Sequence, residues 1–450
     1  MLTFIGFFCV YLVGAVLAKA QQRMVNGMTC TAPEVLRFVR ENDVKFIRLA
    51  FCDLFGTLKN ISIMVDELPR AFEEGVSFDA SAILGFSDVV RSDLFLIPDP
   101  STLCVLPWRP SEGRVVRLFC DVRNPDGTMY PCDVRARLRG VGRKLELAGY
   151  TPKFGTECEF YLFKTDENGD PTHIPHDRGG YFDIAPIDRG ENIRREICLC
   201  LEQMGIRPET SHHEQGPGQN EIDFKYDDAL PAADHFMTFR SVVKAIAARN
   251  GLYASFLPKP LPDCSGNGVH LNISVLKQGE NIFSNSKNRC ESEYFIAGVL
   301  SHVSEITAFL NPIENSYARL GAFEAPRYIS WSHQNRSQLI RIPAASREKM
   351  RMELRSPDSA MNPYIGFTLL LAAGFEGIEK KTPLPPPTDR NLYTEAVDTL
   401  EALPETLGAA LDAAERSAFV KNALGEELLC RYIRHKRAEL ARGGDYFALI

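Results

Sequence analysis

The sequence predicts an α+β protein with two domains, a small strand-rich domain followed by a larger one built on a mostly antiparallel sheet. Three observations support this prediction. The 450 residues, 45% of them hydrophobic and 24% charged, are enough for two sizeable cores. Candidate strands are joined as hairpins in some places and through long helices in others, unlike a doubly wound parallel sheet. A turn at residues 124–127 separates the two stretches.

The first domain is expected to contain one helix and four strands. Thr31 followed by Ala32-Pro33-Glu34 is the order of residues that starts a capped helix. Runs with strand-like patterns then predict strands at residues 44–51, 59–65, 103–107 and 115–121. This combination is typical of a small α+β domain.

An amphipathic helix at residues 133–148 is expected to open the second domain. Further strands are predicted at residues 153–163, 205–213, 219–225, 253–258, 268–276, 337–342 and 351–355, and long helices at 191–204, 232–249, 291–310 and 363–380. The prolines at residues 385–387 predict a loop before a helical C-terminus.

Charge and cysteine content exclude several classes of protein. The net charge of −7 comes from interspersed charges without a basic block, which argues against a nucleic-acid surface. A small anionic substrate would therefore have to be held by local arginines. The 12 cysteines have neither metal-site nor disulfide-framework spacing, so we interpret them as reduced, mostly buried thiols.

Five carboxylates and one imidazole form the candidate metal-binding set: Glu157, Glu159, Glu214, Glu221, His270 and Glu353. In a strand, residues i and i+2 point to the same face, so Glu157 and Glu159 lie side by side with Cys158 turned away. Taken alone, such a pair is more typical of a solvated strand face. Together, the six exceed the needs of one cation, and their oxygen-rich mix favours Mg²⁺ or Mn²⁺ over zinc. They predict a two-metal site for phosphoryl chemistry.

Glycine-rich loops and arginines accompany these candidates. Residues 214–223 place carboxylates on both sides of a Gly-Pro-Gly loop, and residues 265–270 form a second loop that leads into a strand. Five arginines follow in the second domain: Arg319, Arg336, Arg341, Arg351 and Arg355. Arg351, Glu353 and Arg355 alternate along one predicted strand. The carboxylate of Glu353 therefore lies between two guanidinium groups, each able to bind a phosphate or carboxylate group through two hydrogen bonds.

Nine short motifs recur in the order found in one family. They are GTECEF (155–160), HHE (212–214), GQNE (218–221), PKP (258–260), GVH (268–270), NSY (315–317), EAP (324–326), NRSQLIRIP (335–343) and ELRSPD (353–358). With these motifs the chain resembles bacterial-type (type I) glutamine synthetase. The resemblance runs from about residue 46 to residue 435.

The resemblance implies a fold and an assembly. Residues 28–130 would form a β-grasp domain, and residues 131–450 the catalytic α+β domain that the family shares with guanidino kinases. Family members are homo-oligomers of two stacked hexameric rings with active sites between neighbouring subunits. Here the chain ends soon after Arg442, short of the tail that locks the rings in many relatives, so a single hexamer or a looser assembly is also considered.

Roles for the metal and substrate residues follow from the matching motifs. By resemblance, Glu159, Glu214 and Glu221 would bind the metal nearer glutamate, and Glu157, His270 and Glu353 the metal nearer the ATP phosphates. Arg319 would hold the α-carboxylate of glutamate. Arg336, Arg341 and Arg355 would hold its γ-carboxylate and the transferring phosphate. Gly266 would approach the substrate amino group through its backbone.

The remaining roles concern ATP and ammonium. Ser274 and Arg351, with Arg341, are expected on the ATP side, and Asn272 is a residue that the family permits at its position. Asp53 from a neighbouring subunit, Tyr181, and Glu324 on a closing flap would form the ammonium pocket. Tyr393 resembles a position that some relatives adenylylate, and we interpret it as an unmodified loop tyrosine.

The activity implied is ATP-dependent ligation of ammonia to glutamate through γ-glutamyl phosphate. A carboxylate is a poor acylating agent, so ATP must first convert the γ-carboxylate of glutamate to an acyl phosphate. Two Mg²⁺ or Mn²⁺ ions and the arginines would neutralise the charge that develops in this step. Two alternatives remain open: a γ-glutamylamine ligase that uses a polyamine or ethanolamine, and a catalytically silent homologue. Three departures from the family pattern bear on the acceptor: a flap one residue shorter between Arg319 and Glu324, Ser265 in place of asparagine, and Asp-Ala-Ser-Ala at 79–82.

The N-terminal segment allows three interpretations. Residues 2–18 are largely apolar, without a positive region before them, and Ala18-Lys19-Ala20 resembles a cleavage site. A signal peptide, a membrane anchor and a misplaced start before Met24 or Met28 are possible. We favour the last for residues 1–27, because an ATP-using enzyme has little use for an exported compartment, and we expect a cytoplasmic protein that binds neither membrane nor nucleic acid. No other segment is long and apolar enough to span a bilayer.

Overall fold

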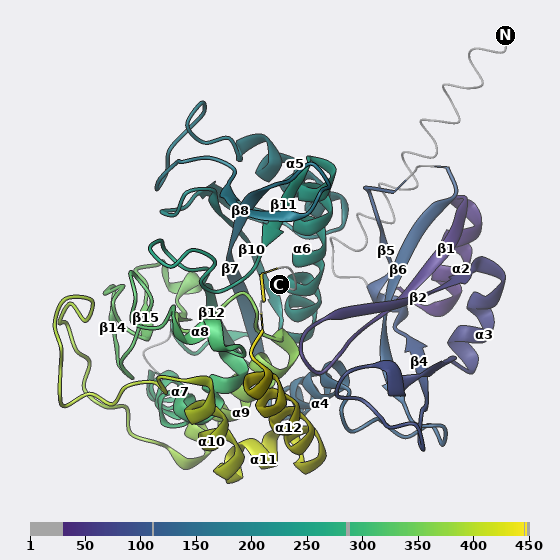
Figure 1. Cartoon of the computed structure of the whole chain (residues 1–450). Helices are drawn as coiled ribbons and strands as arrows, with labels where there is room; N and C mark the ends of the chain where they lie inside the picture. Colours follow the sequence, from purple (N-terminus) through teal and green to yellow (C-terminus); the bar gives the residue numbers. More distant parts are fainter. Residues whose placement is uncertain (1–29, 110–111, 285–288, 445, 448–450) are drawn as a thin grey trace. The chain divides into compact units, whose positions relative to one another are not determined.

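The computed structural model describes residues 30–109, 112–284, 289–444 and 446–447 (Figure 1). The predicted leader at residues 1–27 lies outside them. No helix in these described ranges combines the length and the hydropathy that a membrane span requires. The described residues divide into two compact units, one made of residues 30–53, Thr57–Asp133 and Ile197–Arg207, the other of Leu54–Gly56, Val134–Glu196 and the described residues from Pro208 onward. The two units are described separately.

The smaller unit is a sheet with two short helices. The helices are α2 (Ala32–Glu41) and α3 (Leu68–Glu73), with single 3₁₀ turns η1 (Val65–Glu67), η2 (Ala80–Ala82) and η3 (Pro100–Thr102). The strands are β1 (Val44–Cys52), β2 (Leu58–Met64), β3 (Val76–Asp79), β4 (Asp93–Pro98), β5 (Cys104–Val105) and β6 (Arg114–Arg123). Their order is β2-β1-β6-β4-β3, with β5 beside β6 and only β1 and β6 parallel among the paired strands described. The predicted helix and four strands are present, whereas β3 and β4 were not predicted.

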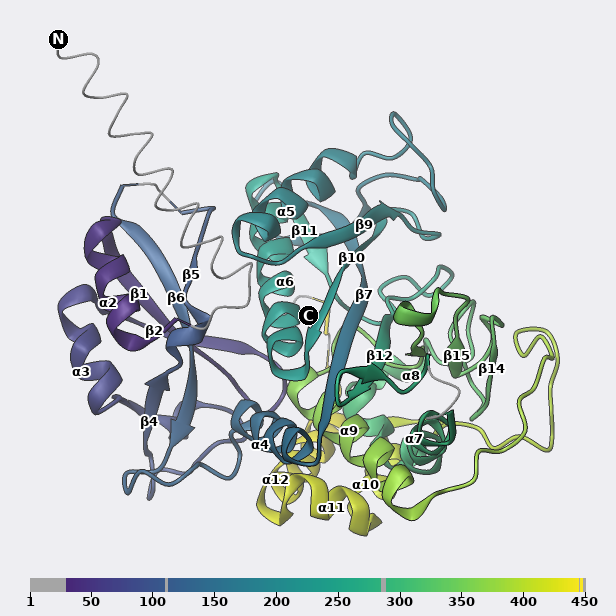
Figure 2. The ribbon, with the colours of Figure 1, turned by 180° about the vertical axis from the view of Figure 1, so that it is seen from behind.

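The larger unit is built on a ten-stranded sheet (Figure 2). Its main order is β14-β15-β16-β12-β7-β10-β9, and β14–β15 is the one parallel pair among the described strands of this sheet. The strands are β7 (Tyr150–Thr165), β8 (Pro171–Pro175), β9 (Pro208–His213), β10 (Gln219–Asp228), β11 (Leu252–Ser255), β12 (Val269–Lys277), β13 (Glu280–Asn281), β14 (Trp331–His333), β15 (Ile340–Ile342) and β16 (Met352–Leu354). The predicted α+β fold with a mostly antiparallel sheet is confirmed.

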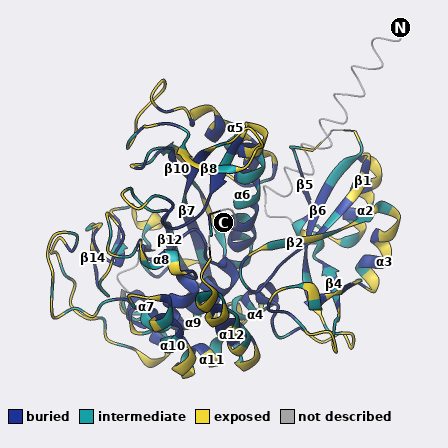
Figure 3. Ribbon diagram, in the orientation of Figure 1, coloured by how far each residue is buried: buried dark blue, intermediate teal, exposed yellow. Residues whose placement is uncertain are grey.

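Three helices, α4 (Val134–Leu147), α6 (Ala229–Arg249) and α9 (Pro363–Lys380), pack on one face of this sheet. The other helices of the unit are α7 (Arg289–Leu310), α8 (Glu314–Tyr317), α10 (Leu407–Arg416), α11 (Ala418–Leu424) and α12 (Glu426–Arg442), with η4 (Arg347–Lys349), while α5 (Glu191–Gln203) has residues in both units. The ring of Phe154 on β7 stacks on Phe367 of α9 with centroids 4.0 Å apart, and Phe160 meets Phe239 of α6. Cys158, on the same face as both, is fully buried. Figure 3 shows β7 and α6 largely in the dark blue of buried residues. The residues between Phe154, Cys158 and Phe160 therefore point to the opposite face.

Several predicted strands are shorter than expected, and two of them lie beside the candidate site. The strand predicted at residues 337–342 is reduced to β15, and residues 335–339 form a turn whose Ser337 is held by the Asn335 side chain. The strand predicted at residues 351–355 is reduced to β16, so Arg351 and Arg355 flank it rather than belong to it. Glu353 is its central residue. Before β15, the Asn335 side chain accepts from the Ser337 backbone N–H, a hydrogen bond that the ladder does not supply. After β16, the Arg355 backbone N–H still donates to a backbone carbonyl, that of Leu339.

A buried ion pair ties three helices of the larger unit together. The guanidinium of Arg135 donates to both carboxylate oxygens of Asp234, at 2.9 and 2.7 Å, and the hydroxyl of Tyr364 donates to the same carboxylate at 2.7 Å. All three side chains are buried. The carboxylate therefore joins α4, α6 and α9 behind the sheet.

Replacement of this carboxylate is expected to destabilise the protein strongly. Asp234→Ala should lower the free energy of unfolding by about 3–5 kcal/mol, because a buried guanidinium loses its counter-charge. Chemical denaturation measures the change. Asp412→Ala is the matched control: Asp412 pairs with Arg437 at 2.8 Å on the surface, where the loss should stay below about 1 kcal/mol. Equal losses in the two variants would contradict the role assigned to the buried pair.

Candidate active site

Strand register gathers the acidic residues on the sheet face away from the helices. Across β9, β10 and β7, His212 pairs with Glu221 and Glu221 with Glu159. Two residues further along, Asp223 of β10 pairs with Glu157 of β7, which also pairs with His270 of β12. Because side chains alternate along a strand, both rows point to the same face.

A third row adds a carboxylate held by arginines. Glu353 of β16 pairs with Asn272 of β12 on one side and with Arg341 of β15 on the other. One Glu353 oxygen accepts from Arg341 Nη1 and the other from Arg355 Nη1, each at 2.6 Å. Arg351 instead donates from Nε to the side-chain oxygen of Asn272 at 2.7 Å. Each Glu353 oxygen keeps a second lone pair, so ligation of a cation remains open to it.

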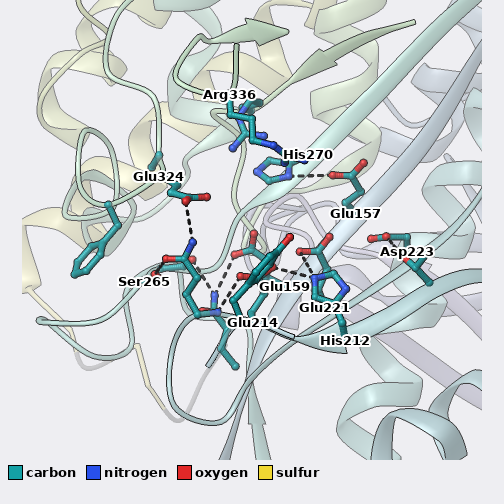
Figure 4. A pocket seen from close by; sticks show the side chains of 18 of the residues that line it. Glu157, Glu159, His212, Glu214, Glu221, Asp223, Ser265, His270, Glu324 and Arg336 are labelled. Carbon is teal, nitrogen blue, oxygen red and sulfur yellow. Dashed lines mark hydrogen bonds and ion pairs between the residues drawn. The ribbon is translucent and has the colours of Figure 1, made fainter. Parts of the chain in front are cut away.

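The residues of the first two rows, with Arg341, Arg351 and Arg355, line a pocket of about 580 Å³ (Figure 4). Its lining includes the predicted site residues Glu157, Glu159, Tyr181, Glu214, Glu221, Gly266, His270, Arg319, Glu324, Arg336, Arg341, Arg351 and Arg355. Glu214 directly follows β9, and its backbone N–H donates to the carbonyl of Gln219 across the turn. The pocket therefore brings together thirteen residues that sequence patterns and family resemblance had indicated.

Two carboxylates of the pocket resist ionisation. Burial raises the pKa of Glu159 to about 7, and the nearby Glu214 carboxylate adds to the shift. Burial also raises the pKa of Glu221 well above its usual value, assisted by the charges of Asp223 and Glu159. Buried like charges repel one another, and a bound cation would relieve that repulsion.

Other carboxylates are held ionised by hydrogen bonds. Burial alone would raise the pKa of Glu157, but hydrogen bonds from His270 at 3.1 Å and Asn272 at 2.8 Å lower it to about 2. Similarly, His212 and the backbone N–H of Gln215 outweigh burial and lower the pKa of Glu214. The pocket thus offers a cation two kinds of carboxylate ligand. Some are already ionised, and others carry a proton that the cation would displace.

Ligand atoms within 4.8 Å of one another mark two places suited to a metal ion. One joins Glu157, His270 and Glu353, the set predicted for the metal nearer ATP, and the other joins His212, Glu214 and Glu221. Glu159 was predicted in the second set, where the structure brings His212 instead. Oxygen-rich sets with one imidazole fit Mg²⁺ or Mn²⁺.

A third cluster, of Asp177, Asp188 and His213, is already occupied by protein hydrogen bonds. Asp177 accepts from the backbone N–H groups of Gly179, Arg189 and Gly218 as well as from His213. Four hydrogen bonds to one carboxylate already satisfy most of its acceptor capacity. We interpret this cluster as a structural support behind the pocket.

Backbone and guanidinium groups complete one wall. Arg319 is buried and donates to the carbonyl oxygens of Ser356 at 2.8 Å and Arg355 at 3.2 Å. A Cβ atom on Gly266 would lie 2.3 Å from the carbonyl oxygen of Pro258 and 3.0 Å from Arg319 Cγ. Only glycine fits at this position, and its backbone therefore faces the pocket closely.

Three predicted residues are not among the described residues that line the pocket. Ser274 lies on β12 four residues after His270, beyond the pocket lining. Glu353 does not line the pocket because its carboxylate is covered by the guanidinium groups of Arg341 and Arg355. Asp53 belongs to the smaller unit, where it is buried and accepts from the Thr57 backbone N–H at 2.8 Å. The predicted part of Asp53 in an ammonium pocket stays a prediction.

Several lining residues were not predicted: His212, Gln215, Asp223, Phe323 and Ala344 among them. Asp223 stands two residues after Glu221, so the same-face rule that paired Glu157 with Glu159 would have found it. His212 stands two residues before Glu214. Gln215 and Phe323 lie in turns, where no such periodic signal exists.

Fold and site together define an enzyme with a carboxylate-lined, cation-competent pocket and arginines for an anionic substrate, the combination used in phosphoryl chemistry. Family models agree. Residues 43–125 match the glutamine synthetase β-grasp domain and residues 131–446 the glutamine synthetase catalytic domain. The chain belongs to the glutamine synthetase family and is an ATP-dependent carbon–nitrogen ligase.

Individual relatives support this assignment. Glutamine synthetase of Methanosarcina mazei is 47% identical over 92% of this chain and 96% of its own, and that of Clostridium saccharobutylicum is 45% identical over 91% and 95%. Among solved structures, GmaS in complex with ADP has a TM-score of 0.83 at 31% identity, covering 90% of this chain and 95% of its own. Plasmodium falciparum glutamine synthetase has a TM-score of 0.81 at 27% identity, covering 92% and 96%.

Proposed function

We propose that the protein makes glutamine from glutamate, ammonia and ATP. The observation that carries this function is one pocket lined by members of two metal-competent groups, by the buried Arg319 and by the arginines that hold Glu353. The metal-competent groups can bind a polyphosphate together with its cations. The arginines can bind the carboxylate of an amino acid. Relatives named glutamine synthetase over almost the whole chain support the same activity.

In this proposal the carboxylate groups hold divalent cations, Mg²⁺ or Mn²⁺. Glu157, His270 and Glu353 would hold the cation on the ATP side, and Glu214 and Glu221, with Glu159 or His212, the other. When bound, such cations neutralise the charge on the transferring phosphoryl group. These donor residues fit such cations. Burial and neighbouring carboxylates raise the pKa values of Glu159 and Glu221, and a bound cation would stabilise their ionised forms.

The arginines of the pocket would position glutamate and stabilise phosphoryl transfer. Arg319, fixed by two carbonyl oxygens, presents its charge to an α-carboxylate, while Arg336, Arg341 and Arg355 neutralise the γ-carboxylate and the phosphate that it receives. The product of this step is γ-glutamyl phosphate and ADP. Arg351 and Ser274 are assigned to the ATP side on family resemblance.

The second step needs an amine without its proton. Ammonium must lose a proton before its nitrogen attacks the γ-carbonyl carbon, so a carboxylate in a desolvated pocket is required. Asp53, assigned to this task by resemblance, would act with Tyr181 and Glu324. The nitrogen then displaces phosphate, and glutamine leaves.

One assay tests this function against both alternatives. Phosphate release from ATP and Mg²⁺ with glutamate is measured with ammonium, hydroxylamine, putrescine and ethanolamine as acceptors. We expect turnover with ammonium and hydroxylamine. Turnover with putrescine or ethanolamine alone would assign the protein as a γ-glutamylamine ligase, and none with any acceptor would leave a catalytically silent homologue.

A further inference from the structure

A short turn forms one wall of the pocket and is held by three other segments. Ala322, Phe323, Glu324 and Ala325 all line the pocket and follow the buried Arg319. We call residues 322–325 the wall turn. Phe323 has a backbone φ of +53°, the left-handed region that bulky residues avoid. Such a conformation persists only where surrounding contacts hold it.

The first contact holds the Glu324 side chain. The amide nitrogen of Gln215 donates to a Glu324 carboxylate oxygen at 2.8 Å, an interaction marked by a dashed line in Figure 4. Gln215 belongs to the turn that connects Glu214 with β10, and its own amide oxygen lies 3.4 Å from the Ser265 hydroxyl. The carboxylate is thereby tied to the turn that carries a candidate metal ligand.

The second contact holds the Glu324 backbone. The Tyr393 hydroxyl lies 2.7 Å from the carbonyl oxygen of Glu324 and 2.6 Å from that of Arg336, so its proton is shared between them. Tyr393 comes from the loop after α9, far along the chain. One hydroxyl therefore fastens the wall turn to the segment that presents Arg336 to the pocket.

The third contact holds the strained residue. The ammonium group of Lys259 lies 4.1 Å from the centre of the Phe323 ring, a cation–π contact. The same ammonium group donates to the carbonyl oxygen of Cys264. Lys259 is 7% exposed, and a desolvated cation gains most from such a contact. The ring is thus fixed in spite of its left-handed backbone.

We propose that Gln215, Tyr393 and Lys259 are positioning residues that latch the wall turn over the bound acyl phosphate and so keep water from it. This inference rests on the proposed function. An acyl phosphate in water is hydrolysed: a water oxygen attacks the γ-carbonyl carbon, the bond to the phosphate oxygen breaks, and glutamate and phosphate are released. A closed wall prevents this loss while the amine arrives.

The test is the number of ADP molecules formed for each glutamine formed. In the unaltered protein this ratio should be close to one. In Gln215→Glu, which keeps the side-chain shape and removes the donor to Glu324, and in Tyr393→Phe, the ratio should rise to about 2 or more, with a higher KM for ammonium and an unchanged KM for ATP. The double variant should exceed both.

Tyr328→Phe is the matched control, because this tyrosine lies outside the pocket lining and outside the three contacts. Its ratio should stay at one. Variants in which glutamine formation slows while the ratio stays at one would overturn the latch, because general loss of structure slows both products together. If the unaltered protein forms no ADP with any acceptor, the proposed function itself fails, which is a different result from a latch variant that stays coupled.

Discussion

Glu353→Ala is expected to reduce glutamine formation about 10³-fold or more. The substitution removes the carboxylate shared by Arg341 and Arg355, and with it one member of the group formed with Glu157 and His270. Removal of a single preorganised electrostatic group commonly costs about 10²–10³ in rate. Here a candidate cation ligand and the anchor of two guanidinium groups are lost at once, so the larger figure applies.

Two further variants separate the causes. Glu353→Gln keeps the shape and one acceptor oxygen but removes the charge, so its rate should fall nearly as far if cation binding is the main role. Glu348→Ala changes an exposed carboxylate five residues away and should leave the rate unaltered. The rate of ADP formation with saturating glutamate, ammonium and Mg²⁺ provides the measurement. More than about a tenth of the original rate in Glu353→Ala would exclude this residue from the machinery.

Local periodicity predicted one part of the candidate metal set, the pair of carboxylates on β7, whereas the other members came from residue type and family resemblance. The same-face rule placed Glu157 beside Glu159, and a buried Cys158 on the other face agrees with it. Patterns cannot give register, however. That Glu221 lies opposite both Glu159 and His212 depends on how three strands pair, which long-range packing decides. For this reason His212 was missed although its motif had been noticed.

Turns were the least predictable part of the site. Gln215 and Phe323 have no periodic neighbours that would mark them, and Tyr393 reaches the pocket wall from a loop whose path depends on tertiary contacts. In the smaller unit, β3 and β4 were not predicted; β3 has only four residues, of which Phe78 alone is buried. Strands of this length are defined by their partners more than by their own residues.

Removal of divalent cations is expected to abolish turnover, and their return should release protons from the pocket. Turnover in a chelator should fall below about 1% and recover with Mg²⁺ or Mn²⁺. In the cation-free protein the pKa of Glu159 is about 7 and that of Glu221 is raised well above its usual value, both chiefly by burial. A cation binds the ionised form, so binding must displace these protons.

The sign of the pH dependence follows from the direction of these shifts. Below pH 7 Glu159 is mostly protonated, so each unit of decreasing pH should weaken cation binding about tenfold through this residue alone. Above pH 7 the contribution of Glu159 to this pH dependence disappears, because its carboxylate is already ionised before the cation binds. Glu157, with a pKa of about 2, is already ionised and adds nothing. Calorimetric titration with Mn²⁺ in two buffers of different ionisation enthalpy counts the protons released at pH 6 and at pH 8.

Glu159→Gln provides the decisive comparison for this proton release. On binding Mn²⁺ at pH 6, the variant should release about one proton fewer than the unaltered protein. At pH 8 the two should release nearly the same number, because Glu159 is mostly protonated at pH 6 and mostly ionised at pH 8. Glu348→Ala should match the unaltered protein at both. A cation affinity that does not vary between pH 6 and pH 8 would show that no raised carboxylate takes part in binding. In that case the buried charge repulsion in the pocket would need a different partner, such as a substrate ammonium group.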